Sequence, residues 1–419
     1  MSGEKIKAPR GTYDVLGEQA AARARIEELA RTLLEGAGYE RIETPVFEAT
    51  DLFARGVGDS TDIVRMEMFT FEDAGGRSLT LRPEGTAPVC RAFIEHGMHK
   101  RRMPVKLWYL SCFFRHERAQ AGRYREFWQV GAETIGSDDP AVDAESITLC
   151  ARVLEQVGAR GVRLRLSSLG SPETRAAYRD KLTDHLRANE TRLSDEVRAR
   201  IDLNPLRAFD SEHEGTLAVM ETAPLLIDEL AADDLEHFAE VRALLEVAGV
   251  PYELDPTLVR GLDYYTRTVF EFTSDALGAQ SGVGGGGRYD RLVEQLGGAA
   301  TPGMGWAAGI ERMLLAAGEA PQPAPEVDLF VALADDGEET RRCAFKLLQA
   351  ARSAALPAQM ELAGRSLKGQ LSGAAALGAR FVAIVSGEES RLKDMQDGGQ
   401  QTIATDTVVH TVLRAQRAL

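Results

Sequence analysis

The sequence predicts an α+β domain built on an antiparallel sheet and interrupted by a helical module, followed by a small α/β domain. Three observations support this fold class. Residues 107–114 and 125–134 are rich in apolar and aromatic residues and have the pattern of two strands, joined by a charged loop that contains Gly122. Residues 173–247 are charged and helical in pattern. Beyond a proline-rich linker, strand and helix patterns alternate.

Composition narrows the class of protein. The 419 residues are 44% hydrophobic and 27% charged, which is ordinary for a globular chain. We expect no membrane association, because no apolar run is long enough to span a bilayer and residues 1–14 lack the core of a signal peptide. Four widely separated cysteines argue against a zinc motif and a disulfide framework, and favour a reducing cytoplasm. The net charge of −15 means that an RNA partner needs a local basic face.

The N-terminal third begins with a predicted helix at residues 18–36, whose apolar residues form one stripe. A strand then ends at Pro45, and residues 68–71 and 78–82 suggest two short strands around a turn. A helix follows, with Glu84 and Thr86 in its first turn. Glu84 either stabilises the helix dipole or faces a cation such as an amino group, and the pattern leaves both interpretations open.

The two strands of the predicted hairpin each present alternate residues to one face. On the second strand, Trp128, Val130 and Ala132 form a packing face. The odd-numbered face carries charged and amide groups, an aromatic ring, and Gly131, which leaves space where a side chain would stand. That face is either solvated or the floor of a ligand site with cations for phosphate. Its members are Phe113, Arg115, Glu117, Arg125, Phe127, Gln129, Gly131 and Glu133.

The second half of the first domain contains three further notable segments. Residues 140–157 are predicted to form a core helix and 163–169 a strand. TLVRGLDYYTRTVFEF clusters an arginine, an aspartate and two tyrosines before a strand at 269–272. Four consecutive glycines, 284–287, indicate either a flexible loop or a backbone that a ligand approaches closely. Residues 301–318 suggest a strand that passes into a helix. Arg312 lies near the start of that helix, where it either faces a phosphate or belongs to a packing interface.

The C-terminal part predicts a mostly parallel sheet. Residues 321–326 form a linker that is rich in proline. Lys368 either faces RNA or is an exposed helix charge. The expected strands are 327–333, 358–362, 381–387 and one within 402–419, and the expected helices are 338–355, 366–378 and the chain end.

Several motifs resemble those of the class II aminoacyl-tRNA synthetases. FRHE followed by a loop and RYREF resembles motif 2, the first helix with GYERIETPVFE resembles the dimer-forming motif 1, and residues 301–318 resemble motif 3. LRPEGT, LVRGLDYYTRTVFE and SGVGGGGRYD are similar to segments of the histidyl-tRNA synthetases. Arg291 stands where that family often has glycine, which puts the local loop geometry in question. The resemblance spans essentially the whole chain, in the family's order.

The resemblance implies a catalytic domain at residues 1–320, with a helical insertion at about 171–250, and an anticodon-binding domain at 327–419. It implies that the protein activates L-histidine with ATP, accompanied by Mg²⁺, and transfers histidine to the 3′ end of its cognate tRNA. It also implies a cytoplasmic homodimer. The sequence identifies no protein ligand for the Mg²⁺.

The same resemblance implies roles for individual residues. Cations neutralise the charge that builds on the α-phosphate during activation. The candidates there are Arg115 and Arg260, with Arg312 at the outer phosphates, Phe127 stacked on adenine, and Glu117 at the adenine or ribose. Histidine is bound by Glu133 and Tyr265 at its two ring nitrogens, by Glu84, Thr86 and Gln129 at its amino group, and by Arg123 at its carboxylate, with Arg260 and Tyr264 nearby. Arg118 and Gln120 match positions that read the tRNA acceptor end.

Three alternatives compete with this prediction. The regulatory subunit of ATP phosphoribosyltransferase resembles the catalytic domain and would make the chain a binding module. Against this, Arg260 stands intact in LVRGLDYY and a full α/β domain follows the linker, which that subunit lacks. A class II synthetase for glycine, threonine or proline is disfavoured by the tyrosine pair and the glycine-rich RYD segment. A pure RNA-binding protein finds no support in the acidic net charge.

Overall fold

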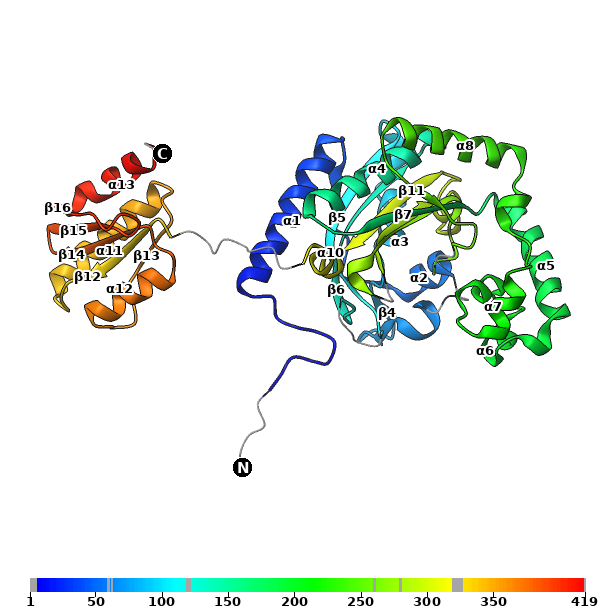
Figure 1. Ribbon diagram of the computed structural model, residues 1–419, viewed down its shortest axis with the longest axis horizontal. Coiled ribbons are helices and arrows are strands. Elements are labelled where there is room, and N and C mark those ends of the chain that lie inside the picture. Colours follow the sequence, from blue (N-terminus) through cyan, green and yellow to red (C-terminus); the bar gives the residue numbers. More distant parts are fainter. Residues whose placement is uncertain are drawn as a thin grey trace, which may run out of the picture. The chain divides into compact units, whose positions relative to one another are not determined.

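The computed structural model describes residues 6–58, 61, 63–117, 122–258, 261–278, 281–318 and 327–417. The chain forms two compact units, one containing residues 22–320 and the other residues 321–419 (Figure 1). Within the described residues, none of the helices combines the length and apolar character needed to cross a membrane.

The large unit is built on an eight-stranded sheet in the order β1-β5-β6-β11-β10-β9-β7-β8. The predicted hairpin is confirmed, since β5 and β6 pair antiparallel with Phe113 opposite Phe127. All neighbours from β5 to β7 are antiparallel, and the short edge strands β1 and β8 pair in parallel. The strands are β1 (Glu40–Arg41), β5 (Val105–Phe114), β6 (Glu126–Ile135), β7 (Val162–Ser168), β8 (Glu253–Leu254), β9 (Thr266–Ser274), β10 (Gly282–Arg288) and β11 (Gly303–Gly309).

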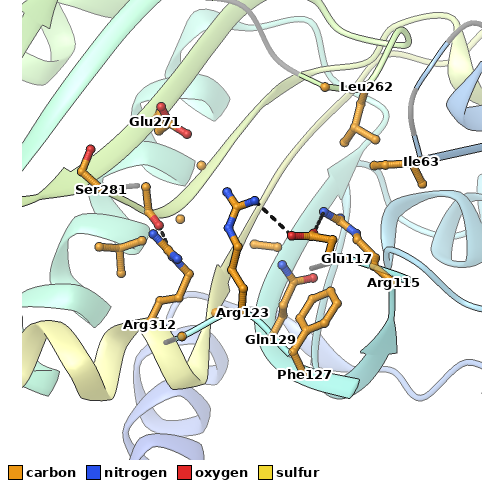
Figure 2. Close-up of a pocket in the computed structure, with 18 of the residues that line it drawn as sticks. Ile63, Arg115, Glu117, Arg123, Phe127, Gln129, Leu262, Glu271, Ser281 and Arg312 are labelled. Atoms are coloured by element: carbon orange, nitrogen blue, oxygen red, sulfur yellow. Dashed lines mark hydrogen bonds and ion pairs between the residues drawn. The ribbon is translucent and has the colours of Figure 1, made fainter. Parts of the chain in front are cut away.

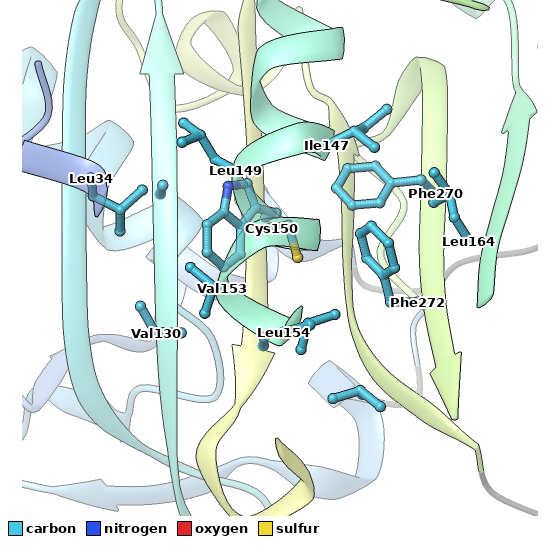
Figure 3. Close-up of a cluster of buried hydrophobic side chains, with 14 of the residues drawn as sticks. Leu34, Val130, Ile147, Leu149, Cys150, Val153, Leu154, Leu164, Phe270 and Phe272 are labelled. Atoms are coloured by element: carbon cyan, nitrogen blue, oxygen red, sulfur yellow. The ribbon is translucent and has the colours of Figure 1, made fainter. Parts of the chain in front are cut away.

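One face of this sheet is covered by helices that bury its main apolar core (Figure 3). The expected packing face of β6 is confirmed, because Val130 and Ala132 are buried in this core and Trp128 packs against it. Figure 3 shows Cys150, Val153 and Leu154 of one helix lying over the strands. The helices that contribute are α1 (Gly17–Gly36), α4 (Pro140–Val157), α8 (Ala232–Val247) and α10 (Ile310–Ala317).

The glycine run does not form a flexible loop but the central strand β10. A Cβ atom on Gly286 would lie 2.0 Å from the carbonyl oxygen of Gly305, and one on Gly284 would lie 2.7 Å from the Cβ of Ala308. The glycines therefore allow β10 to lie against β11 at a distance that a side chain would prevent. The close approach that the structure shows is between two strands of the protein, and the approach of a ligand to this backbone stays a prediction.

The opposite face of the sheet carries a second core, made by aromatic residues, α3 (Thr86–Glu95) and the inserted helices. A separate three-stranded sheet lies beside it in the order β2-β4-β3. Its strands β3 (Phe69–Glu72) and β4 (Ser78–Leu81) agree with the predicted pair. The strand predicted up to Pro45 is displaced, because β1 ends at Arg41, residues 42–46 are not in a strand, and β2 (Phe47–Ala49) begins after the proline. The short helix α2 (Thr50–Val57) follows β2.

The helical stretch after β7 consists of α5 (Pro172–Ala188), α6 (Asp195–Arg200), α7 (Glu214–Met220) and α8, with short 3-10 turns between them. Figure 1 shows α5, α6 and α7 grouped together, while α8 runs back over the sheet. Phe238, Val241 and Leu245 of α8 are buried in the main core. The end of the stretch is therefore part of the sheet's own packing.

A buried ionic network joins the end of β10 to α4 and α8. Arg288 is fully buried, and its Nε lies 2.7 Å from Oδ1 of Asp143, which is also fully buried. His237 of α8 lies 2.9 Å from the same carboxylate through its Nε2. Arg288 also donates to the carbonyl oxygens of Ser137 and Asp139 at 3.1 and 3.0 Å. The guanidinium thus holds β10 to residues 137–143, and the Asp143 carboxylate in turn contacts His237 of α8.

We expect Arg288→Met to destabilise the large unit by about 3–5 kcal/mol, because the buried Asp143 carboxylate would lose its cationic partner. The matched control is Arg31→Met, which removes the exposed ion pairs of Arg31 with Glu28 and Glu35 on α1 and should have little effect on stability. Urea unfolding followed by tryptophan fluorescence reports on this unit, since Trp108, Trp128 and Trp306 all lie in it. Equal destabilisation by the two variants would contradict the expectation.

The small unit has a five-stranded sheet in the order β13-β12-β14-β15-β16. The prediction of a mostly parallel sheet is wrong in part. Strands β13, β12 and β14 are parallel, whereas β15 and β16 pair antiparallel. Its strands are β12 (Leu329–Leu333), β13 (Ala358–Met360), β14 (Phe381–Ser386), β15 (Glu389–Asp394) and β16 (Gln400–Ala404). Its helices are α11 (Glu338–Ser353), α12 (Leu367–Ala376) and α13 (Val408–Arg417).

The helices of the small unit cover both faces of this sheet. Leu347 of α11 and Val412 of α13 are buried in one apolar cluster, and Ala374 of α12 is buried in another. Strand β15 was not predicted, because its sequence ESRLKD is mostly charged and follows the turn at Gly387. Covering a sheet on both faces is the arrangement expected of an α/β domain.

Candidate active site

A cavity of about 710 Å³ opens where the β5–β6 hairpin approaches β10, β11 and the start of α10 (Figure 2). Six of the residues predicted from the sequence line it. They are Arg115, Glu117, Arg123, Phe127, Gln129 and Arg312. Gly282, Gly284 and Gly285 of β10 also line it, so the glycine run presents bare backbone to the cavity.

The cavity is rich in positive charge. Glu117 lies between two arginines, with Arg123 Nη1 donating to its Oε2 at 3.0 Å and Arg115 Nη1 lying 3.7 Å from its Oε1 (Figure 2). Arg312 donates its Nε to the carbonyl oxygen of Gly282. Burial lowers the pKa of Arg312, and the positive charge of Arg123 acts in the same direction. An anion bound here would relieve that repulsion.

The aromatic floor of the cavity is Phe127. The guanidinium carbon of Arg115 lies 5.4 Å from the centre of its ring, and the ring of Phe113 lies 6.1 Å away on the neighbouring strand. Arg115 is further fixed by donating its Nε to the carbonyl oxygen of Pro83 at 2.9 Å. Phe127 and Arg115 together form a flat surface on which a planar ring can stack.

Beside the cavity, Glu133 is the centre of a buried polar cluster. Its carboxyl group is fully buried and accepts hydrogen bonds from three hydroxyl groups, those of Tyr289 at 2.7 Å, Thr86 at 2.8 Å and Tyr109 at 3.3 Å. Burial raises the pKa of Glu133 to about 8, although the hydroxyl donors oppose that shift. A Cβ atom on Gly305 would lie 1.7 Å from Glu133 Oε2, so glycine there makes room for the carboxyl group.

The space expected above Gly131 is filled by the protein itself. A Cβ atom on Gly131 would lie 2.4 Å from the ring of Tyr109, and one on Gly85 would lie 2.5 Å from the same ring. The prediction that Gly131 leaves room for a ligand is therefore wrong in this structure. The two glycines instead seat the tyrosine that donates to Glu133.

Glu84 stabilises the start of α3, which is one of the two interpretations left open by its sequence. Its carboxylate accepts the backbone N–H groups of Thr86 and Ala87 at 2.7 and 2.9 Å, so it caps the first turn of α3. It also accepts the hydroxyl of Tyr264 at 3.4 Å and faces the buried cluster. Burial raises the pKa of Glu84, while the N–H donors and the charge of Arg115 act against that shift.

The tyrosine pair lies in the same buried region. Tyr264 and Tyr265 are 4% and 6% exposed, and their ring centres are 4.8 Å apart. Tyr264 lies 6.0 Å from Tyr289, which connects the pair to the Glu133 cluster. The predicted residues therefore form two adjoining groups, a cationic cavity and a buried polar cluster. Arg260, Arg118 and Gln120 lie outside the described residues.

The N-terminal segment supports the outer side of the cavity, which the sequence did not indicate. The carbonyl of Gly11 accepts the N–H of Arg125 at 2.7 Å, and the ring of Tyr13 packs 4.5 Å from that of Tyr124. The hydroxyl of Tyr13 donates at 3.2 Å to Glu311, a buried residue at the start of α10. The segment thus ties the hairpin end to the helix that carries Arg312.

Three residues of the site were missed at the level of sequence. Tyr109 stands at an odd position of the first strand, so the alternation that selected Phe113 would have found it. Tyr289 directly follows the glycine run and Arg288. Glu271 lines the cavity from β9, and its alternation with apolar neighbours placed it on the exposed side of the strand.

Metal ligands were assessed for the part of the chain that the structure describes. No group of three or more His, Cys, Asp or Glu side chains converges there as a protein-held metal ion would require. Glu271 does present a carboxylate to the cavity, close to the backbone of Gly282. Glu117 and Glu311 also line the cavity. Mg²⁺ is commonly bound by one or two carboxylates together with substrate phosphates, and the carboxylates present fit that mode.

Comparison with known proteins places the chain in a family. A family model described as histidyl-tRNA synthetase matches residues 11–313. The histidine–tRNA ligase of Desulforudis audaxviator (strain MP104C) is 47% identical, over 98% of this chain and 99% of its own length. That of Corynebacterium diphtheriae is 45% identical over 99% of each chain.

Solved structures agree with the sequence comparisons. The crystal structure of apo S. aureus histidyl-tRNA synthetase matches with a TM-score of 0.81 at 35% identity, over 97% of this chain and 100% of that one. An ATP phosphoribosyltransferase regulatory subunit/histidyl-tRNA synthetase from Bacillus halodurans C matches with a TM-score of 0.66 at 24% identity, over 89% of this chain and 97% of that one, which shows a shared fold. The chain belongs to the histidyl-tRNA synthetase family, within the class II aminoacyl-tRNA synthetases.

Proposed function

We propose that the cationic cavity and the adjoining Glu133 cluster are the ATP and histidine subsites of a histidine–tRNA ligase. The family to which the chain belongs uses ATP, histidine and tRNA. In the first step, a carboxylate oxygen of histidine attacks the α-phosphorus of ATP, and pyrophosphate leaves. In the second, a hydroxyl of the tRNA 3′ end attacks the carbonyl carbon of histidyl-adenylate, and AMP leaves.

The first step needs positive charge more than it needs a base, since the attacking carboxylate is already ionised at neutral pH. Arg115 and Arg260 neutralise the α-phosphate, and Arg312 binds the outer phosphates. Phe127 stacks on adenine, and Glu117 holds the adenine or ribose. The observation that carries this proposal is the convergence of Arg115, Arg123 and Arg312 on one cavity above an aromatic floor.

The histidine subsite needs partners for both ring nitrogens. Glu133 meets one and Tyr265 the other, while Glu84, Thr86 and Gln129 take the amino group and Arg123 the carboxylate. Tyr264 and Arg260 complete the site. Support comes from β6, whose odd-numbered face carries both Gln129 of the cavity and Glu133, and from the buried state of Glu133 and both tyrosines. Buried polar groups of this kind reject side chains that leave them unpaired.

Mg²⁺ bound with ATP would shield the charge of the phosphates. Of the carboxylates that line the cavity, Glu271 would be a candidate to hold it, while also paired with Arg165 at 3.4 Å. The protein's own residues position the phosphates and keep the reacting atoms apart from bulk water.

The partners of the rest of the chain follow from the same family membership. We infer that Arg118 and Gln120 contact the tRNA acceptor end and that residues 327–419, after the linker at 321–326, bind the anticodon. A cavity of about 630 Å³ in the small unit is lined by Arg341, Arg342, Lys346 and Arg365, which supports RNA binding there. Lys368 is exposed on α12 and is not among the residues that line this cavity.

We also propose a homodimer in the cytoplasm. The three-stranded sheet exposes Phe47 and Phe71 at 50% and 42%, with their ring centres 6.1 Å apart, as suits a surface that a second copy covers. All four cysteines are unpaired, which suits a reducing compartment. Sedimentation of the full chain at micromolar concentration tests the dimer, which a purely monomeric boundary would exclude.

The test of the reaction is exchange of labelled pyrophosphate into ATP with each of the twenty amino acids in turn. Exchange with histidine and with no other amino acid is the expected result. Binding of histidine by calorimetry without any exchange would favour the competing function, a histidine-sensing relative of the regulatory subunit, and the catalytic assignments would then be wrong.

A further inference from the structure

The loop that carries the tyrosine pair is tied to the helical insertion on both of its sides. Tyr264 and Tyr265 immediately precede β9 in the chain, so Asp263 lies before the pair and the first residues of β9 lie after it. Arg175 of α5 contacts Asp263, before the pair, and Asp234 of α8 contacts Arg267, after it. The insertion, rather than the sheet alone, therefore sets where the loop lies.

Arg175 lies in the first turn of α5, the first helix of the insertion. Its Nη1 donates to the carbonyl oxygens of Asp263 and Tyr265 at 3.0 and 3.2 Å, and its Nη2 lies 3.9 Å from Oδ1 of Asp263. One guanidinium thus spans the turn that contains Tyr264. Hydrogen bonds from a charged donor are stronger than neutral ones, so this contact fixes the turn more firmly than a backbone bond would.

On the other side of the pair, Arg267 adopts a left-handed backbone conformation with φ of 45°. Such a conformation is unfavourable for a residue other than glycine and persists where neighbouring contacts enforce it. Its Nε donates to Oδ1 of the buried Asp234 at 3.0 Å. Oδ2 of Asp234 accepts the N–H of Ser171, the residue that caps α5, at 2.7 Å. The Asp234 carboxylate therefore contacts both the start of the insertion, at Ser171, and the residue that leaves the loop, Arg267.

Packing between the loop and the insertion is incomplete. The tyrosines share a buried apolar cluster with residues of the insertion, but a cavity of about 330 Å³ remains between the two, and its lining includes Arg175, Leu206, Tyr264 and Tyr265. The tyrosines have room to move on this side unless a specific contact prevents it. Arg175, which bridges the loop at the edge of the cavity, supplies such a contact.

We propose that Arg175 is a positioning residue through which the helical insertion holds Tyr264 and Tyr265 in the geometry that binds histidine. This inference rests on the proposed histidine subsite. It assigns to the insertion a role in amino-acid binding, before any tRNA is present. Arg175 itself does not line the ATP cavity, to which residues 261–267 of the loop contribute only at Gly261 and Leu262, so its loss should act on histidine far more than on ATP.

The experiment compares Arg175→Ala with Arg179→Ala in the full chain. Arg179 lies one turn further along α5 and donates to the carbonyl oxygens of Asp202 and Leu203, both within the insertion, so it is the matched control. We expect Arg175→Ala to raise the KM for histidine in pyrophosphate exchange by about ten- to a hundredfold, since a small misplacement of a binding group has effects of this size. The KM for ATP should change less than about twofold, and Arg179→Ala should change neither.

A second readout separates positioning from loss of fold. Hydrogen–deuterium exchange of peptides that cover residues 261–267 should speed up in Arg175→Ala and stay unchanged in Arg179→Ala. Arg175→Lys, which keeps the charge but has a single nitrogen, should give an intermediate KM for histidine and replaces the alanine variant if the latter does not fold. An unchanged KM for histidine, or equal increases for histidine and ATP, would overturn the inference. Absence of histidine-dependent exchange in the unaltered chain would instead overturn the proposed function.

Discussion

Arg115→Ala should reduce histidine-dependent pyrophosphate exchange by about 10²–10³-fold or more in kcat, because a preorganised donor at the α-phosphate is worth roughly 3–4 kcal/mol in a water-poor site. The guanidinium is held against the ring of Phe127 and the carbonyl of Pro83 before any substrate arrives. It therefore needs no rearrangement to meet the charge that develops on phosphorus. Arg115→Lys should recover part of the rate, since it restores charge without the planar donor pair.

The control for Arg115 is Arg77→Ala. Arg77 lies on the exposed turn between β3 and β4, is 80% exposed and pairs with Asp73. We expect its removal to leave the exchange rate and the unfolding midpoint unchanged. Arg115→Ala should also keep its fold, since it breaks contacts at the rim of a cavity and none in the core. An exchange rate within threefold of the unaltered chain would remove Arg115 from the chemistry.

Glu133→Gln should lower kcat/KM for histidine by about a hundredfold or more, because the amide cannot reproduce the hydrogen bonds of the carboxyl group toward both its hydroxyl donors and an imidazole. The variant keeps the size of the side chain, so the space beside Gly305 stays filled. Glu28→Gln, on the exposed face of α1, is the control. Pyrophosphate exchange at varied histidine measures the effect, and an unchanged kcat/KM would show that Glu133 has no part in recognition.

The same variant should change how stability depends on pH. Burial raises the pKa of Glu133 to about 8, so the folded chain binds a proton that the unfolded chain releases near pH 4.3. The proton's contribution to stability is complete below about pH 4 and is lost as the pH rises to about 8. Relative to Glu133→Gln, the unaltered chain should lose about 1.4 kcal/mol per pH unit between pH 5.5 and 8. Urea unfolding at several pH values measures this, and parallel profiles for the two chains would contradict it.

Much of the fold was predictable because the segments that determine it are strongly patterned. The β5–β6 hairpin, α4 and the strand-to-helix passage at residues 301–318 were all placed by local periodicity and lie where they were expected. Most members of the cationic cavity followed from one alternating strand face together with motif resemblance. The contribution of Arg312 depended on resemblance alone, since a single arginine near a helix start has no distinctive pattern.

Other features depend on contacts between segments that are remote in sequence, so local pattern could not reveal them. The glycines of β10 have no apolar alternation, and their pairing with β11 on one side and β9 on the other makes them a strand. Tyr109 fills the space over Gly131 because Gly85, from another segment, makes room as well. Arg291 stands where the family often has glycine, yet its φ of −102° is ordinary, so the loop does not require a glycine there.

The order of strands in the large sheet determines how long each strand waits for its partner while the protein is synthesised. Strand β6, which carries Glu133, pairs with β11, and the two are separated in the chain by the whole insertion. At roughly 5–20 residues per second, a ribosome needs on the order of ten seconds or more after making β6 before β11 exists. During that interval the Glu133 carboxyl lacks Tyr289 and the glycine that accommodates it. The nascent hairpin then exposes an unpaired edge, which makes it a natural client for chaperones.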